Sequence, residues 1–156
     1  MEKMEQIGKA VLDYRFYPED DKYTDGAIED EMLEIARNCS PEQYERVIVE
    51  KKSWPILYHF SYLRENIIRW LPMDGSENVL EIGAGPGAIT GALCEKGRQV
   101  TVIDLSKKRC LINAYRHKDC DNLHFLVGNF QDIEPKLTEQ YDLITLIGVF
   151  EYAQFS

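Results

Sequence analysis

The sequence has few of the features that metal, membrane or nucleic-acid-binding proteins require. Its four cysteines (Cys39, Cys94, Cys110 and Cys120) form no C-x-x-C pair, and no histidine stands at metal-ligand spacing, so no metal site is predicted. It has no secretory-type start and no apolar run long enough to span a bilayer, so we expect a cytoplasmic protein without a membrane partner. The 27 acidic residues outnumber the 18 basic ones, and the net charge of −9 disfavours nonspecific binding to nucleic acid.

The most informative segment that is present is Asn78–Gly87, which reads Asn-Val-Leu-Glu-Ile-Gly-Ala-Gly-Pro-Gly. A short apolar strand carries one acid, Glu81, and opens into three alternate glycines. Because such a strand is buried, its carboxylate must be paired or face a polar pocket. The glycines (Gly83, Gly85 and Gly87) allow a sharp turn and a close approach of the backbone to a ligand. The N–H groups of a helix that follows would point at the same pocket.

Two classes of cofactor are bound by a strand, a glycine loop and a helix. Dinucleotide enzymes use G-x-G-x-x-G, with the helix start facing a pyrophosphate. Here the spacing is G-x-G-x-G, Pro86 removes one N–H, and the carboxylate of Glu81 would repel a phosphate but attract a cation. The pattern E-x-G-x-G-x-G, with Ala84 inside the loop, resembles motif I of class I S-adenosylmethionine-dependent methyltransferases. Their cofactor carries a sulfonium and an ammonium group. An NAD-dependent oxidoreductase is the weaker alternative.

From residue 76 onward, strand and helix patterns alternate, which is typical of a parallel α/β sheet. The expected strands and helices are 78–82, 88–96, 99–103, 107–117, 123–127 and 141–147, and the start of another helix is expected within 151–154. The right-handed crossover rule gives the strand order 3-2-1-4. The resemblance implies a Rossmann-like fold of seven strands, of which four are found, so the sequence suggests a chain truncated after strand 4. Its open edge would need cover from the N-terminal helices or from a second copy in a homo-oligomer.

The first part of the chain shows no strand alternation, and the sequence predicts two units: an N-terminal helical or lid segment, 1–75, and a cofactor-binding half-domain, 76–156. One helix is expected over 25–38 with Asp25 as its N-cap. A second should begin at Ser40, where Pro41 and Gln43 complete a capping box. A third is expected over 57–71.

Asp104 ends the second strand of the half-domain, 21 residues after Gly83. Adenosine-binding Rossmann-like folds place an acid there to accept hydrogen bonds from the ribose hydroxyls, and Leu105 lies beside it. Asp104 could instead cap the next helix, but Ser106 can supply that cap. NAD enzymes also carry this acid, so it supports a ribose without choosing the cofactor.

The resemblance to the methyltransferases implies further roles after the third and fourth strands. Asn129 matches a position that contacts the adenine amine, with Asp132 as a rival, and Phe130 could contact the adenine ring. Ile147 would offer its carbonyl oxygen to the methionine amine. Glu151 and Tyr152 either shape the acceptor pocket or only begin a helix.

Further segments (54–61, 63–66, 81–91 and 148–153) resemble a bacterial methyltransferase subfamily often linked to glycosyltransferases. This implies methyl transfer from S-adenosylmethionine to a small-molecule or glycan-related hydroxyl or amine, without a nucleic-acid partner. The alternative is a non-catalytic module that binds S-adenosylmethionine or S-adenosylhomocysteine. Tyr58, His59 and Arg64 could approach the methionine carboxylate or the acceptor. A histidine on an apolar helix is more often a packing residue than a base, so no catalytic base is assigned.

Overall fold

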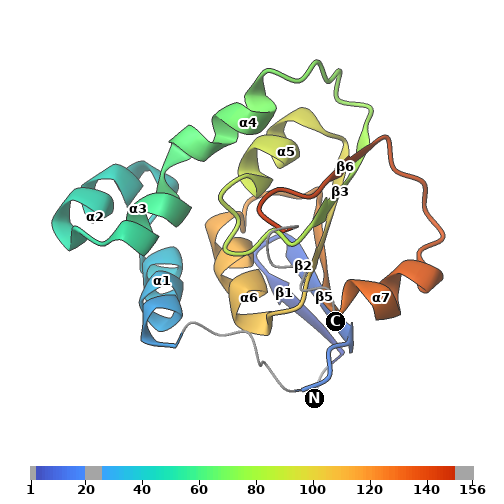
Figure 1. Cartoon of the computed structure of the whole chain (residues 1–156), viewed down its shortest axis with the longest axis horizontal. Coiled ribbons are helices and arrows are strands. Elements are labelled where there is room, and N and C mark those ends of the chain that lie inside the picture. Colours follow the sequence, from blue (N-terminus) through green and yellow to red (C-terminus); the bar gives the residue numbers. More distant parts are fainter. Residues whose placement is uncertain (1–2, 20–25, 150–156) are drawn as a thin grey trace.

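The computed structural model describes residues 3–19 and 26–149, and its centre is a six-stranded sheet (Figure 1). The strands are β1 (Met4–Ile7), β2 (Ala10–Phe16), β3 (Asn78–Ile82), β4 (Gln99–Asp104), β5 (Leu123–Gly128) and β6 (Leu143–Thr145). They lie in the order β1-β2-β5-β4-β3-β6. Only β1 and β2 pair antiparallel, and the other neighbours are parallel. The four strands β5-β4-β3-β6 confirm the predicted α/β fold and the order 3-2-1-4.

The hairpin of β1 and β2 corrects one expectation, because the N-terminal part was predicted to contain no strand. β2 pairs in parallel with β5, with Leu12 opposite Phe125, and both side chains are fully buried. The signal was present in Ala10, Leu12 and Tyr14, which alternate along β2 and are all buried. The hairpin therefore extends the sheet at its β5 edge. The predicted division at residue 75 stays a prediction.

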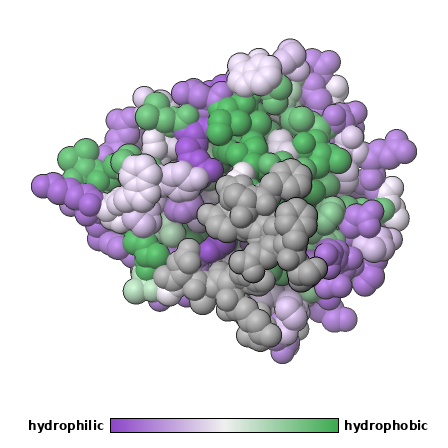
Figure 2. Space-filling model, in the orientation of Figure 1, coloured by the Kyte–Doolittle hydropathy of each residue, from purple (hydrophilic) through white to green (hydrophobic). Residues whose placement is uncertain are grey.

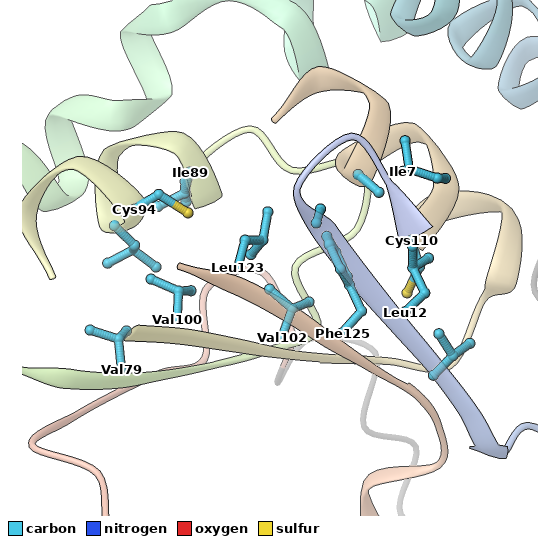
Figure 3. Packing of buried hydrophobic residues seen from close by; sticks show 14 of the residues in the cluster. Ile7, Leu12, Val79, Ile89, Cys94, Val100, Val102, Cys110, Leu123 and Phe125 are labelled. Atoms are coloured by element: carbon cyan, nitrogen blue, oxygen red, sulfur yellow. The ribbon is translucent and has the colours of Figure 1, made fainter. Parts of the chain in front are cut away.

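Two helices, α5 (Thr90–Lys96) and α6 (Lys107–Arg116), cover one face of the sheet, and their apolar side chains share its main core (Figures 1 and 3). In Figure 3, Cys94 of α5 and Cys110 of α6 point toward the strands that carry Val100, Val102 and Phe125. On the opposite face, the short helix α7 (Phe130–Ile133) and the turn η3 (Glu134–Lys136) cover a smaller cluster around Leu80. The central strands are thus apolar on both faces, as buried parallel strands should be.

The N-terminal helices form a further layer outside α6 (Figure 1). They are α1 (Ala27–Asn38), η1 (Pro41–Gln43), α2 (Tyr44–Lys51), α3 (Trp54–Phe60), η2 (Tyr62–Glu65) and α4 (Asn66–Arg69). α1 packs along α6, where Met32, Ile56 and Phe60 surround Ile112 in a separate apolar cluster. The capping box predicted at Ser40 is present, with its backbone N–H donating to Oε1 of Gln43 at 2.8 Å.

The structure differs from the sequence prediction in the helix expected over 57–71. The single helix expected over 57–71 is wrong, since it is divided into α3, η2 and α4. Ser61 interrupts it with an extended backbone (φ −67°, ψ 132°), and its hydroxyl accepts the N–H of Leu63, which starts a new turn. The predicted cap, Asp25, lies outside the described residues, and the structure gives Gly26 the N-cap position of α1.

At the other edge of the sheet, β6 pairs with β3, and two apolar side chains are exposed: Ile144 in β6 is 51% accessible, and Leu146, just after it, is 37% accessible. Figure 2 shows hydrophobic residues gathered over the region where α5, β3 and β6 lie in Figure 1. The N-terminal helices pack on α6 and α5. They do not cover this edge, contrary to one of the two expectations for it. Within the described ranges, no helix combines the length and apolarity needed to cross a bilayer.

Candidate functional site

The glycine loop after β3 turns back over the carboxyl ends of β3 and β4. Gly83, Gly85 and Gly87 all have positive φ angles (70°, 56° and 86°), a conformation that other L-residues adopt only with strain. The N–H of Gly83 donates to the carbonyl oxygen of Ile103 at 2.8 Å, which ties the start of the loop to β4. Helix α5 begins at Thr90 rather than at residue 88 as predicted, because residues 85–89 form turns.

The three glycines have different surroundings. A side chain at Gly83 would overlap Val149, and one at Gly87 would overlap the side-chain amide of Asn113. Only the Cβ direction of Gly85 opens into free space. The expectation that all three glycines make room for a ligand therefore applies to Gly85, whereas the outer two make room for the protein's own side chains.

A pocket of about 190 Å³ lies at the carboxyl ends of β3, β4 and β5. It is lined by Ile82, Gly83, Ile103, Asp104, Leu105, Gly128, Asn129 and Phe130. Five of the predicted site residues thus share one cavity, although they come from three loops that are far apart in the sequence. Three lining residues, Ile82, Ile103 and Gly128, were not predicted from the sequence, although each stands at the end of an apolar strand, which was the available signal. In open parallel sheets, this end of the strands is where ligands bind.

Asp104 is buried and holds two loops together. Its Oδ2 accepts the N–H of Gly85 at 2.8 Å, and its Oδ1 accepts the N–H of Ser106 at 3.0 Å. Ser106 caps α6 through its own hydroxyl, as predicted, so Asp104 is not needed for that cap.

Asn129 has a local role as well as a place in the pocket wall. It is exposed, and its Oδ1 accepts the N–H of Gln131 at 3.0 Å, which caps α7. Phe130 is half-buried and packs against the cluster formed by Leu80, Ile82, Ile103 and Ile133. The predicted adenine contacts of Asn129 and Phe130 stay predictions.

Glu81 lies near the end of β3 beneath the loop, and only 5% of its surface is accessible. Its Oε2 accepts a hydrogen bond of 2.6 Å from the hydroxyl of Thr90. Burial raises the pKa of Glu81 to about 7, and the negative charge of Asp104 adds to the rise. The Thr90 hydrogen bond and the positive charges of Arg64 and Arg116 oppose it. Glu81 is therefore a buried acid that titrates near neutral pH.

The remaining predicted residues lie around this centre. Ala84 and Ile147 are half-buried and pack against the main core. Tyr58 is exposed beside the guanidinium of Arg64, whose central carbon lies 4.2 Å from the ring centroid. Arg116 donates to the carbonyl oxygen of His59 at 2.8 Å, which links α3 to α6. Glu151 and Tyr152 lie outside the described residues.

A second and larger pocket, of about 580 Å³, lies away from the strand ends, between the N-terminal helices and the outer faces of α5 and α6. Tyr44, Phe60, Arg116 and His117 are among the residues that line it. Since it contains neither the glycine loop nor Asp104, it is not the pocket that the sequence predicted. Over the residues that the structure describes, no three His, Cys, Asp or Glu side chains cluster so as to hold a metal ion.

The parallel sheet, the glycine loop and the pocket at the strand ends define a Rossmann-like α/β protein. Residues 80–155 match the model of the methyltransferase domain family. The predicted resemblance to the methyltransferases is thereby confirmed.

Individual relatives are similar over part of their length. The chain is 32% identical over 84 residues to ribosomal RNA small subunit methyltransferase A of Pseudomonas putida, which covers 54% of this chain and 30% of that protein. The same enzyme of Novosphingobium aromaticivorans is 57% identical over 35 residues, or 22% of this chain and 12% of that protein. The chain thus spans less than a third of these curated relatives.

Among solved structures, phosphoethanolamine N-methyltransferase 1 of Haemonchus contortus, in complex with phosphoethanolamine and S-adenosylhomocysteine, is 22% identical to this chain, with a TM-score of 0.48. The match covers 72% of this chain and 25% of that one.

Proposed function

We propose that this chain binds S-adenosylmethionine at the carboxyl ends of β3, β4 and β5 and takes part in transfer of its methyl group to an acceptor. The observation that carries the proposal is the pocket shared by Gly83, Asp104, Asn129 and Phe130, which lies at the ends of three neighbouring strands, one of which carries the buried acid Glu81. The match of residues 80–155 to the methyltransferase domain family supports the same reading.

In this proposal each part of the cofactor has a partner of suitable chemistry. Asp104 would accept hydrogen bonds from the ribose hydroxyls, while Asn129 and Phe130 would bracket the adenine. Ala84, Gly85 and Gly87 would lie beneath the methionine part, and the carbonyl oxygen of Ile147 would accept from its amine. Glu81 would face the ammonium group, because a carboxylate attracts a cation and repels a phosphate. The same charge argument, together with Pro86, disfavours NAD as the cofactor.

The reaction would be an in-line displacement at the sulfonium methyl. A lone pair of the acceptor forms the new bond to carbon, the carbon–sulfur bond breaks, and its electrons neutralise sulfur to give S-adenosylhomocysteine. The acceptor proton passes to solvent or to a base. The cofactor supplies the reactive methyl group, and the protein supplies position and electrostatics.

The acceptor is a separate question. The net charge of −9 disfavours RNA, and the subfamily resemblance implies a small-molecule or glycan-related hydroxyl or amine, whereas the two curated relatives are, by their names, ribosomal RNA methyltransferases. Transfer of a radioactive methyl group to a monosaccharide glycoside, a primary amine or ribosomal RNA would separate these classes. The alternative function, a binding module without catalysis, predicts cofactor binding but no transfer to any acceptor.

Isothermal titration calorimetry with S-adenosylhomocysteine tests the binding step. We expect binding by the native chain and its loss in Asp104→Ala, with both proteins shown to be folded by circular dichroism. Absence of binding by the folded native chain would refute the proposal. Micromolar binding of NADH instead would favour the oxidoreductase alternative.

A further inference from the structure

A chain of three hydrogen bonds leads from Glu81 through the interior to α6. The hydroxyl of Thr90 donates to Oε2 of Glu81 at 2.6 Å. The side-chain amide of Asn113 donates in turn to the Thr90 hydroxyl at 2.8 Å. Oδ1 of Asn113 lies 2.7 Å from Nδ1 of His117. Glu81, Thr90 and Asn113 are buried, so water does not compete for these bonds.

The hydrogen-bond partners of His117 determine which atom donates and which accepts in each of these bonds. Its Nδ1 lies 3.0 Å from the backbone carbonyl oxygen of Asn113 as well as 2.7 Å from Oδ1 of the same residue. A carbonyl oxygen can only accept, so Nδ1 carries the proton and donates. The Asn113 amide is thereby oriented with its NH₂ group toward Thr90. The Thr90 oxygen accepts that bond, which leaves its single proton for Glu81.

The glycine loop is built around this arrangement. A Cβ atom at Gly87 would overlap the side-chain amide of Asn113. The last glycine of the motif therefore makes room for the middle of the hydrogen-bond chain, and the loop and the chain fit together as one unit.

We propose that Thr90, Asn113 and His117 are positioning residues that hold the carboxylate of Glu81 as the acceptor for the ammonium group in the methionine part of the cofactor. This inference rests on the proposed function. It assigns a role to three residues outside the glycine motif, at the beginning of α5, within α6 and directly after α6.

The charges around Glu81 indicate how the chain of hydrogen bonds would affect its ionisation. Asp104 of β4 raises the pKa of Glu81, in addition to burial, whereas Arg64 of η2 and Arg116 of α6 lower it. The Thr90 hydrogen bond from α5 also lowers it, because it stabilises the ionised carboxylate. Burial lowers the pKa of His117 to about 3, so this ring is neutral at physiological pH and contributes a hydrogen bond and not a charge. Loss of the Thr90 hydroxyl would therefore leave less of Glu81 ionised at neutral pH.

The test compares two ligands that differ in the amino-acid part. S-adenosylhomocysteine carries the ammonium group, and 5′-methylthioadenosine lacks it. Calorimetry between pH 6 and 8.5 would compare the native chain with Thr90→Val, which removes the hydroxyl, and Thr90→Ser, which keeps it. Thr101→Val is the matched control, because Thr101 is also buried but pairs with Leu80, which packs on the opposite face of the sheet.

We expect Thr90→Val to weaken S-adenosylhomocysteine about tenfold at pH 7 and to leave 5′-methylthioadenosine within about twofold. The midpoint of the pH dependence should rise by about one to two units, the effect of one hydrogen bond to a charged group. Thr90→Ser and Thr101→Val should behave like the native chain. Equal weakening of both ligands by Thr90→Val, or no weakening of either, would overturn the inference.

Two further outcomes are informative. If Thr90→Val does not fold, His117→Leu tests the half-buried end of the hydrogen-bond chain. We expect the midpoint of the pH dependence to shift in the same direction by a smaller amount, and no shift would overturn the inference. If the native chain binds neither ligand, the proposed function itself fails. That result is distinguishable from failure of the positioning role, which requires a native chain that binds both.

Discussion

The backbone N–H of Gly85 donates a hydrogen bond of 2.8 Å to the carboxylate of Asp104, which joins the middle of the glycine loop to the end of the neighbouring strand. The other oxygen of Asp104 accepts the N–H of Ser106. One buried carboxylate therefore positions both loops at the mouth of the pocket. Asp104 therefore stabilises the two loops in the absence of a ligand.

Asp104→Asn should destabilise the ligand-free protein, because an amide has one acceptor oxygen where two backbone N–H groups need one each. We expect a loss of roughly 1–3 kcal/mol in the free energy of unfolding, measured by urea denaturation. Asp142→Asn is the matched control, because Asp142 accepts a single backbone N–H, that of Asn78, which an amide oxygen can still accept. Equal stability losses in the two variants would contradict the anchoring role.

Substitution of the loop glycines should separate two causes of strain. Both Gly85→Ala and Gly87→Ala force alanine into a positive φ, at a cost of about 1 kcal/mol. Gly87→Ala also overlaps the Asn113 amide, while Gly85→Ala meets open space. We therefore expect Gly87→Ala to lower the free energy of unfolding by at least about 2 kcal/mol more, as measured by urea denaturation. Equal losses would mean that Asn113 moves aside without cost.

The loop and the strand ends were predictable because they depend on local sequence. Three glycines in positive φ and an acid at the end of β4 are encoded within a few residues of where they act. The hydrogen-bond chain was not predictable in this way, because Glu81, Thr90 and Asn113 are brought together by packing of α5 and α6 on the sheet. Asn113 also lies in a helix whose pattern indicates only a buried face.

The N-terminal hairpin was missed for a related reason. Ala10, Leu12 and Tyr14 alternate as in a strand, but Asp13 between them is also buried, which the sequence pattern does not indicate. Asp13 is tolerated inside because Arg15, two residues along, pairs with it at 2.6 Å. The parallel partner of the strand, β5, lies more than 100 residues further along the chain, and no local pattern reports such a pairing.

Because the hairpin contributes to the main core, Leu12→Ala should be strongly destabilising. The side chain is fully buried against β5 and its neighbours, and truncation would leave a cavity. We expect a loss of about 2–5 kcal/mol in the free energy of unfolding by urea denaturation. Met4→Ala is the control, since Met4 lies in the same hairpin but is 46% exposed. A small effect of Leu12→Ala would instead indicate a hairpin that detaches from the sheet.

The buried acid Glu81 should make the ligand-free protein less stable as the pH rises. Its pKa is about 7 in the folded state, against 4.5 in an unfolded chain, so between these values the unfolded state binds fewer protons than the folded state. For this group alone, stability is therefore constant below about pH 4.5, falls between pH 4.5 and 7, and levels off above pH 7. Glu81→Gln removes this titration. The free energy of unfolding of the variant, relative to that of the native chain, should therefore increase between pH 4.5 and pH 8, by at most roughly 3 kcal/mol.

Urea denaturation of both proteins at several pH values between 4.5 and 8 measures this difference directly, and changes in other groups cancel in the comparison. The same variant should bind S-adenosylhomocysteine more weakly, because a neutral amide attracts an ammonium group less than a carboxylate does. Gain of stability together with loss of affinity would identify Glu81 as an acid kept for binding at the expense of folding. A Glu81→Gln protein whose stability relative to the native chain does not change with pH would contradict the neutral titration of this group.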